Sequence, residues 1–435
     1  MSIEYEGRVW ERIVDDTQEY EEGSLFVLSE QNSKYASSLP EDAVSISPKE
    51  LKSLWGLDGL KVVGVSGTNG KTTTSAIIYS LLEDLGHSCA FQGTRGLYIG
   101  DERVEEKSLT TPSIFDTLKN MKRAADAGAE YFVMEVSSHA IAQNRIEGID
   151  FALKVHTNVT RDHLDYHGTI EEYRRVKSLF FSDESMKLIN RDEMKSISFN
   201  PANAWTYAVE EPAAFKILAY SLNGGVSGVI RFEKEQESFR SNLMGLFNLY
   251  NATAAISAVK LLTDAPLADI CEELEYFGGV AGRMERVSEN PAVIVDFAHT
   301  DDGIYRVLDS LKDKELCVVF GAGGERDRSK RPAMGAVVGR FAKKIYITSD
   351  NPRSEEPEKI IEEIAASLDG KENVHKITDR REAIRMALLE QEEDEIVLIL
   401  GKGDENYQEI AGERHPFDDR EVAREILAEL GAGGE

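Results

Sequence analysis

The run Gly67-Thr68-Asn69-Gly70-Lys71-Thr72 has the residues of a phosphate-binding loop. It carries the G-K-[ST] end of the pattern G-x-x-x-x-G-K-[ST], follows a strand-like segment and opens a helical one. The first glycine of the pattern falls at Val65, so Gly67 is expected to supply the backbone freedom of the loop. Backbone N–H groups and the helix N-terminus attract phosphates, Lys71 neutralises their charge, and Thr72 is suited to ligate Mg²⁺. The run therefore predicts a nucleotide site.

Two further strand-like segments are followed by side chains that bind metals. Glu135 comes directly after residues 131–134, and His163 follows residues 151–155. The carboxyl ends of parallel strands share one edge of a sheet, so both side chains are expected near the phosphate loop. Glu135 is expected to hold Mg²⁺ near the γ phosphate, and His163 to serve the same metal or a second one. A structural hydrogen-bonding role for His163 stays open.

A second group of strand ends, nearer the C-terminus, combines arginines with a carboxylate. Arg326, the run 350–353 and the run 401–405 each follow an apolar segment. An arginine fork pairs with a carboxylate and an aspartate with an ammonium, so the group suits a zwitterionic amino acid. Arg353 would repel the ammonium of a lysine, which favours a side chain that ends in a second carboxylate. The alternative for Asn351 and its proline is a plain turn.

The elements that position these residues follow an alternating pattern of strand, glycine turn and helix. This pattern is typical of parallel sheets with crossover helices, and it restarts after Gly278-Gly279. After the phosphate loop, Ile78, Leu81, Leu82 and Leu85 lie on one helical face, and Gly86 is expected to end that helix. The clearest strands are expected within residues 24–28, 62–66, 131–134, 151–155, 292–295, 316–320, 344–348 and 396–400.

The chain has 435 residues, which exceeds the size of a single core. We expect an α/β fold in three domains: a small N-terminal α/β domain (1–55), a central P-loop parallel-sheet ATPase domain (56–281) and a C-terminal Rossmann-like domain (282–435). The net charge of −28 disfavours nucleic acid and anionic membranes as partners. The three cysteines have no metal-binding spacing, and the N-terminus lacks a signal peptide, so a cytoplasmic protein is expected.

Several motifs together resemble the Mur ligases of peptidoglycan synthesis, and they run in the family's order from residue 67 to residue 408. The resemblance implies ATP-driven amide synthesis with Mg²⁺, in which a substrate carboxylate becomes an acyl phosphate that an amine then attacks. The motifs are GTNGKTT (67–73), EVSSHA (135–140), TNVTRDHLDYHG (157–168), FNLYN (247–251), GRME (282–285) and DNPR (350–353).

The resemblance also assigns residues that the patterns by themselves do not. It implies that ATP is bound by Gly67, Thr68, Asn69, Gly70, Lys71, Thr72, Thr73, Asn248, Asn251, Arg283, Asp296 and His299. It implies that Thr110, Thr111, Ser137, Gln143 and Arg145 hold a nucleotide-sugar peptide, UDP-N-acetylmuramoyl-L-alanyl-D-glutamate. The incoming amino acid is assigned to Arg326, Asp350, Asn351, Pro352, Arg353, Gly401 and Glu405. The threonines also allow a simpler interpretation, in which Thr111 caps a helix that begins at Pro112.

Lys177 stands where the family carries a carbamylated lysine. The sequence without the family would make it a solvated helix lysine. The resemblance instead implies N6-carboxylysine, which adds an anionic ligand to the metal set of Thr72, Glu135 and His163. Carbamylation needs a lowered lysine pKa, and the neighbouring Arg174 and Arg175 are expected to help provide it. Lys71, Glu135, His163 and Lys177 are thus the expected catalytic residues.

The run 350–353 resembles the motif of the family members that add meso-diaminopimelate. We therefore expect that amino acid as a substrate. We also expect the protein to be a monomer that does not insert into a membrane. Three alternatives remain: a lysine-adding variant, a folylpolyglutamate-type ligase, and a nucleotide-dependent binding protein without catalysis. The chain also departs from the family pattern in a short first domain and at Asp404, Asn406 and Asp301, which replace the usual histidine, aspartate and proline.

Overall fold

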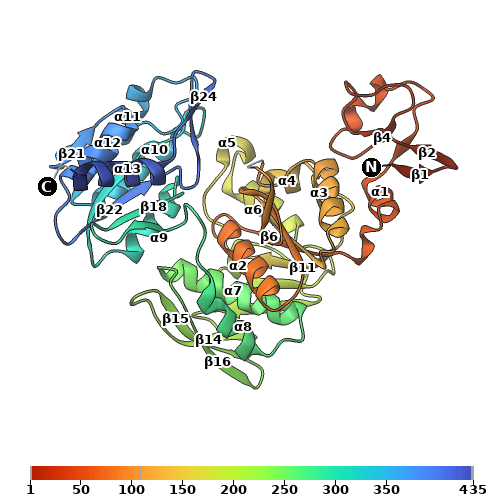
Figure 1. The fold of residues 1–435 in the computed structure, drawn as a ribbon, viewed down its shortest axis with the longest axis horizontal. Helices are drawn as coiled ribbons and strands as arrows, with labels where there is room; N and C mark the ends of the chain where they lie inside the picture. Colours follow the sequence, from red (N-terminus) through yellow and green to blue (C-terminus); the bar gives the residue numbers. More distant parts are fainter. Residues whose placement is uncertain (1, 107–108, 433–435) are drawn as a thin grey trace.

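The protein is described by a computed structural model that covers residues 2–106 and 109–432. Its N-terminal part is a small lobe beside the rest of the molecule (Figure 1). The lobe contains the hairpin β1 (Ile3–Tyr5) and β2 (Arg8–Trp10), the parallel strands β3 (Ile13–Val14), β4 (Leu25–Val27) and β5 (Ser45–Ile46), and helix α1 (Pro48–Leu54). The strand predicted within residues 24–28 is confirmed as β4.

An eleven-stranded sheet forms the centre of the molecule. Its strands run in the order β16 (Glu235–Ser241), β15 (Val226–Phe232), β14 (Phe215–Ser221), β13 (Ala204–Ala208), β12 (Lys187–Asn190), β11 (Phe151–His156), β6 (Lys61–Ser66), β10 (Tyr131–Val136), β7 (Cys89–Gly93), β8 (Gly96–Ile99) and β9 (Glu102–Glu105). The strands from β14 to β7 are parallel, and antiparallel strands flank them on both sides. The three strands predicted for this region are confirmed as the neighbours β11, β6 and β10.

Helices cover both faces of the central sheet and close a hydrophobic core on each (Figure 1). One face packs against α2 (Lys71–Asp84), α7 (Leu246–Leu262) and α8 (Leu267–Glu273). The other packs against α3 (Ile114–Asp126) and α6 (Ile170–Leu179), with the short α4 (Ser138–Ala142) and α5 (Leu164–His167) near the strand ends. Because both faces are covered, the inner strands are apolar almost throughout, as parallel sheets require.

The C-terminal part is a six-stranded sheet with its own two cores. Its order is β17 (Glu285–Ser288), β18 (Val293–Asp296), β22 (Glu395–Leu400), β19 (Glu315–Phe320), β20 (Lys344–Ile347) and β21 (Val374–Lys376), with only β17 antiparallel. Helices α9 (Asp301–Ser310), α10 (Lys330–Phe341) and α11 (Pro357–Ala365) cover one face, and α12 (Arg380–Leu389) and α13 (Asp419–Ala432) the other. A hairpin of β23 (Tyr407–Ile410) and β24 (Glu413–Pro416) lies beyond β22. The predicted restart of the α/β pattern is confirmed.

Helix boundaries confirm one local prediction and correct another. Gly86 follows α2 with a φ of +85°, a left-handed conformation that glycine adopts easily. The proposed cap at Thr111 is wrong, because α3 begins at Ile114 and the Ser113 hydroxyl accepts a hydrogen bond from Asp116 N at 3.1 Å. Within residues 2–106 and 109–432, none of the helices combines the length and the apolar character needed to cross a bilayer.

Candidate active site

The phosphate loop connects β6 to α2 at the carboxyl edge of the central sheet. Lys71 Nζ donates to the carbonyls of Gly67 and Thr68 at 2.8 and 2.9 Å, so the loop wraps around the ammonium. The residue with a left-handed conformation is Gly70, with a φ of +84°, whereas Gly67 was expected to provide that freedom. Gly67 is needed for close approach instead, since a Cβ there would lie 1.8 Å from Thr157 Oγ1. Burial lowers the pKa of Lys71.

Glu135 lies directly beside the start of α2, as the strand-edge argument predicted. Its side chain is buried, Thr72 Oγ1 donates to Oε2 at 3.0 Å, and Thr94 N donates to Oε1 at 3.0 Å. Thr94 was missed in the sequence, although it follows β7 and obeys the same strand-edge rule. A hydroxyl and a carboxylate side by side are the hard oxygen ligands that Mg²⁺ prefers, so Thr72 and Glu135 fit that ion.

His163 lies in a second polar group at the end of β11. Its Nε2 is 3.3 Å from Asp162 Oδ2, and Lys330 of α10 donates to Asp162 Oδ1 at 2.6 Å. Burial lowers the pKa of His163, which leaves the imidazole neutral at pH 7, the form that binds metals. Burial opposes ionisation of Asp162, yet His163 and Lys330 together lower its pKa. Glu135 and Asp162 both oppose the effect of burial on the pKa of Lys71, so the two carboxylates lie near its ammonium.

Lys177 is fully buried on the inner face of α6, which contradicts the interpretation as a solvated helix lysine. Its Nζ donates to Gly67 O at 2.9 Å and lies 5.1 Å from the centre of the Tyr173 ring. Burial, and then the charge of Lys71, lower its pKa well below the ordinary value. The expected contribution of Arg174 and Arg175 is wrong, because both side chains are exposed and Arg175 pairs with Glu172 at 2.8 Å.

These groups surround the phosphate loop without forming a ready-made metal cluster. Among the residues that the structure describes, no three His, Cys, Asp or Glu side chains are close enough to hold an ion by themselves. The pair of Thr72 and Glu135 and the residue His163 therefore lie at two neighbouring places, with Lys177 behind the loop.

The residues assigned to the nucleotide-sugar peptide do come together. Thr111 Oγ1 donates to Glu135 O at 2.8 Å and accepts from Ser137 N at 3.1 Å, and the Ser137 hydroxyl caps α4. Arg145 donates to Thr111 O at 2.8 Å and to Gln143 Oε1 at 2.6 Å. The Thr110 hydroxyl lies 3.1 Å from that of Thr94. This polar surface begins where the Glu135 site ends.

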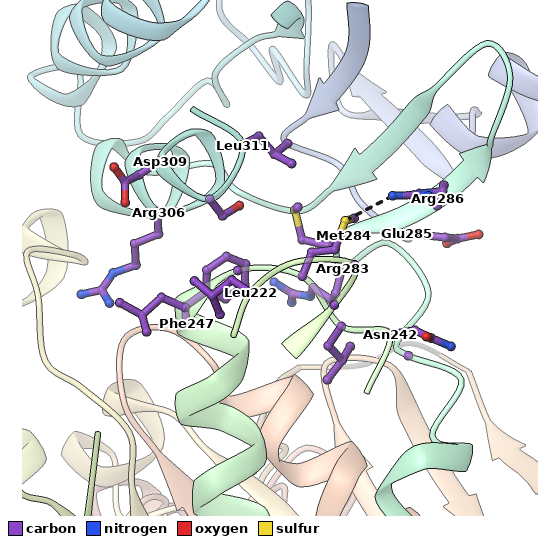
Figure 2. Close-up of a pocket in the computed structure, with 18 of the residues that line it drawn as sticks. Leu222, Asn242, Phe247, Arg283, Met284, Glu285, Arg286, Arg306, Asp309 and Leu311 are labelled. Carbon is purple, nitrogen blue, oxygen red and sulfur yellow. Dashed lines mark hydrogen bonds between the residues drawn. The ribbon is translucent and has the colours of Figure 1, made fainter. Parts of the chain in front are cut away.

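A cleft of about 1510 Å³ opens between the central and C-terminal parts (Figure 2). Phe247 at the start of α7 and Arg306 of α9 come from helices on its two sides, and Arg283 also lines it. Arg283 Nη2 reaches 3.4 Å from Thr72 Oγ1, and its guanidinium lies 4.2 Å from the centre of the Phe297 ring. Arg283 thus connects this cleft to the phosphate loop.

Arg283 lines this cleft, and the other residues assigned to ATP lie outside its lining. Asn251 Nδ2 donates to Asn248 Oδ1 at 2.9 Å, and a Cβ at Gly70 would lie 2.4 Å from Asn251 Oδ1. The asparagine pair is buried and supports the loop from behind. The buried Asp296 carboxylate accepts from the backbone N–H groups of Met284 and Ala298, both at 2.7 Å, which shapes the turn after β18. His299 is exposed on that turn.

The ends of the C-terminal strands come together at the predicted amino-acid crevice. Asp350 is buried, and its Oδ2 has no hydrogen-bond partner among the described residues. Asn351 Nδ2 donates to Glu405 Oε2 at 2.9 Å, and the buried Lys402 donates to the same oxygen at 3.0 Å. Gly401 approaches so closely that a Cβ there would lie 2.6 Å from Asp350 Oδ2. Lys402 was not predicted as a site residue.

Both predicted arginines of the crevice face one glycine turn. Arg353 has a φ of +52°, an uncommon conformation for a residue with a side chain, and such residues gather at functional sites. Its Nη1 donates to Gly324 O at 2.6 Å, which is the turn that Pro352 O also approaches. Arg326 is exposed nearby, and after burial and Arg145 it contributes to lowering the pKa of His139 in the central part.

Direct contacts bring the two large parts together around the phosphate loop. Asp302 of α9 accepts from Asn69 Nδ2 at 2.9 Å and from Thr160 Oγ1 at 3.0 Å. Lys330 and Asp162 form a third such contact, described above. The starts of α9 and α10 in the C-terminal part therefore lie beside the phosphate loop and the residues around it.

Asp404, which replaces the usual histidine of the family pattern, forms an ion pair in the structure. Asp404 Oδ2 lies 3.8 Å from Arg95 Nε, and Arg95 comes from the turn between β7 and β8. This ion pair joins the loop after β22 to the central part.

We predict that Arg95→Gln lowers kcat/KM about 2- to 5-fold, because partly exposed ion pairs contribute little binding energy and are screened by salt. The effect should shrink in 0.5 M salt, while Arg103→Gln on the neighbouring strand β9 should have none; equal losses in both variants would contradict the pairing.

Comparisons with known proteins decide the family. Residues 65–259 match the Mur ligase middle domain, and residues 282–403 match the Mur ligase glutamate ligase domain. The chain belongs to the Mur ligase family. It is therefore an ATP-dependent ligase.

Named relatives within this family cover the whole chain. The chain is 50% identical over 422 residues to a UDP-N-acetylmuramoyl-L-alanyl-D-glutamate–2,6-diaminopimelate ligase of Wolinella succinogenes, covering 97% of each protein. The protein of the same name in Helicobacter pylori is 44% identical, with 99% of each covered. A solved structure under that name has a TM-score of 0.68 at 31% identity and covers 99% of this chain and 98% of its own. A folylpolyglutamate synthase complexed with ADP and AMPPCP shares the fold at 18% identity, with a TM-score of 0.67, covering 81% of this chain and 91% of its own.

Proposed function

We propose that this Mur ligase adds meso-diaminopimelate to UDP-N-acetylmuramoyl-L-alanyl-D-glutamate at the expense of ATP. The observation that carries the proposal is the group of Asp350, Arg326 and Arg353 at the C-terminal strand ends, in the part of the chain whose helices α9 and α10 contact the residues around the phosphate loop. Asp350 presents a buried carboxylate oxygen without a partner, suited to an ammonium, and the arginines supply cations for carboxylates. The names of the relatives agree with this substrate pair.

The reaction divides into two steps that the site can position. A carboxylate oxygen of the nucleotide-sugar peptide attacks the γ phosphorus, the bond from that phosphorus to the ADP oxygen breaks, and an acyl phosphate forms. The amine of diaminopimelate then attacks the acyl carbon, phosphate leaves, and the amine loses a proton. Lys71 and the loop N–H groups hold the β and γ phosphates during the first step. The residues Thr110, Thr111, Ser137, Gln143 and Arg145 are proposed to orient the peptide.

Thr72 and Glu135 would hold Mg²⁺, and His163 a second ion. When bound, the metal neutralises negative charge on the phosphates. Arg283 adds a cation from the C-terminal part beside Thr72, so closure of the two parts completes the positive surround of the γ phosphate. The cleft lined by Phe247 and Arg283 is proposed for the adenosine. Four residues would then act on ATP indirectly. Asn248 and Asn251 would shape the phosphate loop, and Asp296 and His299 would shape the turn after β18.

Lys177 is proposed to work as a carbamate. The neutral amine uses its lone pair to bond the carbon of CO₂, one C=O electron pair moves onto oxygen, and the amine proton leaves to solvent. Complete burial and the lowered pKa of Lys177 support the neutral amine that this step requires. The carbamate of Lys177 has a carboxylate group, which an ammonium lacks, and this group would lie near the metal sites beside Gly67.

The domain limits 1–55, 56–281 and 282–435 also remain our proposal. The separate pairs of hydrophobic cores on the two large sheets support a division near residue 282. The three cysteines are free and buried, which agrees with action in a reducing cytoplasm, and we propose a monomer.

A substrate scan tests the proposed function. Phosphate release should require the UDP-linked dipeptide, ATP, Mg²⁺ and meso-diaminopimelate together. Replacing diaminopimelate with lysine should lower kcat/KM at least about 100-fold, because juxtaposed like charges cost several kcal/mol. Ornithine should behave like lysine. Equal turnover with lysine would overturn the substrate assignment and leave the reaction class intact.

A further inference from the structure

His156 is a buried polar side chain without a hydrogen bond. It is the last residue of β11, and neither Nδ1 nor Nε2 has a partner among the described residues. Its ring packs edge-on against Phe181 at 5.7 Å. Buried polar groups are nearly always hydrogen-bonded, so an unsatisfied imidazole indicates a group that it serves. None of the roles assigned above uses this histidine.

Ser66 shares this property and lies next to His156. The two residues are register partners in the parallel strands β6 and β11. The Ser66 hydroxyl is buried and also lacks a partner among the described residues. Side chains two residues apart share a face of a strand, and a Cβ at Gly64 would touch the rings of Phe151 and Phe180. Ser66 therefore points to the face that α6 covers.

Lys177 approaches the same face from α6. Its Nζ donates a hydrogen bond to the carbonyl of Gly67, the residue directly after Ser66. Burial, and then the charge of Lys177, lower the pKa of His156. The end of α6 also brings Phe180 and Phe181 against the two strands. Three unsatisfied polar atoms, one on Ser66 and two on His156, thus gather beside a buried amine.

We propose that Ser66 and His156 are positioning residues that hold the carbamate of Lys177. The proposal rests on the carbamate of the proposed function. The Ser66 hydroxyl and one imidazole N–H would donate to one carbamate oxygen, which leaves the other oxygen free to face the metal. A hydrogen bond to a carboxylate stabilises the charged adduct and so opposes loss of CO₂. The Ser66 hydroxyl and one of the two imidazole nitrogens then have a partner when the lysine is modified.

The test measures carbamate formation itself. The intact enzyme is titrated with ¹³C-bicarbonate, and the carbamate carbon is followed by NMR in the wild type, Ser66→Ala, His156→Phe and His156→Gln. The bicarbonate concentration at half labelling should rise about 10- to 100-fold in Ser66→Ala and His156→Phe, the effect of losing a hydrogen bond to a charged group. His156→Gln, which keeps an N–H donor, should lie between these variants and the wild type.

Ser75→Ala is the matched control, because Ser75 on α2 also has a buried hydroxyl without a partner among the described residues. Its labelling should equal that of the wild type, and thermal melts should show that each variant folds. Saturating bicarbonate should restore turnover in Ser66→Ala. Unchanged half-labelling in both Ser66→Ala and His156→Phe would overturn the proposal, as would a wild type without a carbamate carbon. The substrate scan tests the proposed ligase reaction independently, whichever result the carbamate labelling gives.

Discussion

Lys177→Ala should lower turnover at least about 100-fold, because the variant loses the carboxylate that the carbamate would bring to the metal sites. The ¹³C signal of the carbamate should disappear from the same variant. Lys177→Arg should be equally inactive, since a guanidinium stays charged and has no free amine for CO₂. A role of Lys177 as a simple cation would instead leave the arginine variant active.

Lys187 offers a matched control for this experiment. It is also a fully buried lysine, but its Nζ donates to the carbonyls of Asp183 and Ala202 at 2.8 and 2.9 Å. Lys187→Ala should therefore lower the melting temperature and keep the carbamate signal. Full activity in Lys177→Ala would contradict the carbamate, whatever the behaviour of Lys187.

Residues at the ends of parallel strands were predictable from the sequence because the sheet fixes where they go. Glu135 lies at the end of a buried strand, and His163 and Asp350 each follow one, so the sheet edges place them at the candidate nucleotide and amino-acid sites. Lys330 was not predictable in this way. It begins a helix of the C-terminal sheet and reaches Asp162 only because the two large parts close on each other.

Lys177 was misread without the family because lysine is usually solvated on a helix. The residue spacing of α6 nevertheless indicates that this lysine is buried. Tyr173, Lys177 and Phe180 are spaced four and then three residues apart, which places the lysine on the apolar face. A lysine on such a face must lose its charge, find a partner or change chemically, so the pattern should count as evidence for a functional amine.

The paired asparagines show a different limit of sequence reasoning. Asn248 and Asn251 are three residues apart and share one face of α7, which the sequence predicts. Which neighbour that face meets depends on how α7 packs on the sheet. The pair contacts the loop at Gly70 and does not line the cleft, so we expect it to act on ATP through the phosphate loop.

The charges of the amino-acid crevice are unequally engaged, and this determines which substrate groups can bind. Lys402 is paired with Glu405 at 3.0 Å, and Arg353 lies 3.5 Å from Glu409. Asp350 keeps a buried oxygen without a partner among the described residues, and Arg326 is exposed. An incoming amino acid therefore meets one available anion and two arginines that can turn to it. This balance favours a substrate whose far end carries a carboxylate.

Arg353→Ala should raise the KM for diaminopimelate far more than the KM for ATP. We expect a loss of about 2 to 4 kcal/mol in kcat/KM for the amino acid, the cost of removing one partner of a largely desolvated charge pair. Arg328→Ala is the matched control, because that arginine is exposed and pairs with Glu355 at 2.7 Å. It should change neither KM by more than about 2-fold.

Arg353 also supports its own loop, so its variants must separate binding from folding. Arg353→Gln keeps a donor for Gly324 O and should preserve the melting temperature, yet it cannot form a charged fork with a carboxylate. It should therefore show nearly the same defect in diaminopimelate use as the alanine variant. If the KM for ATP rose as much as the KM for diaminopimelate, Arg353 would act in closure of the two parts and not in recognition of the amino acid.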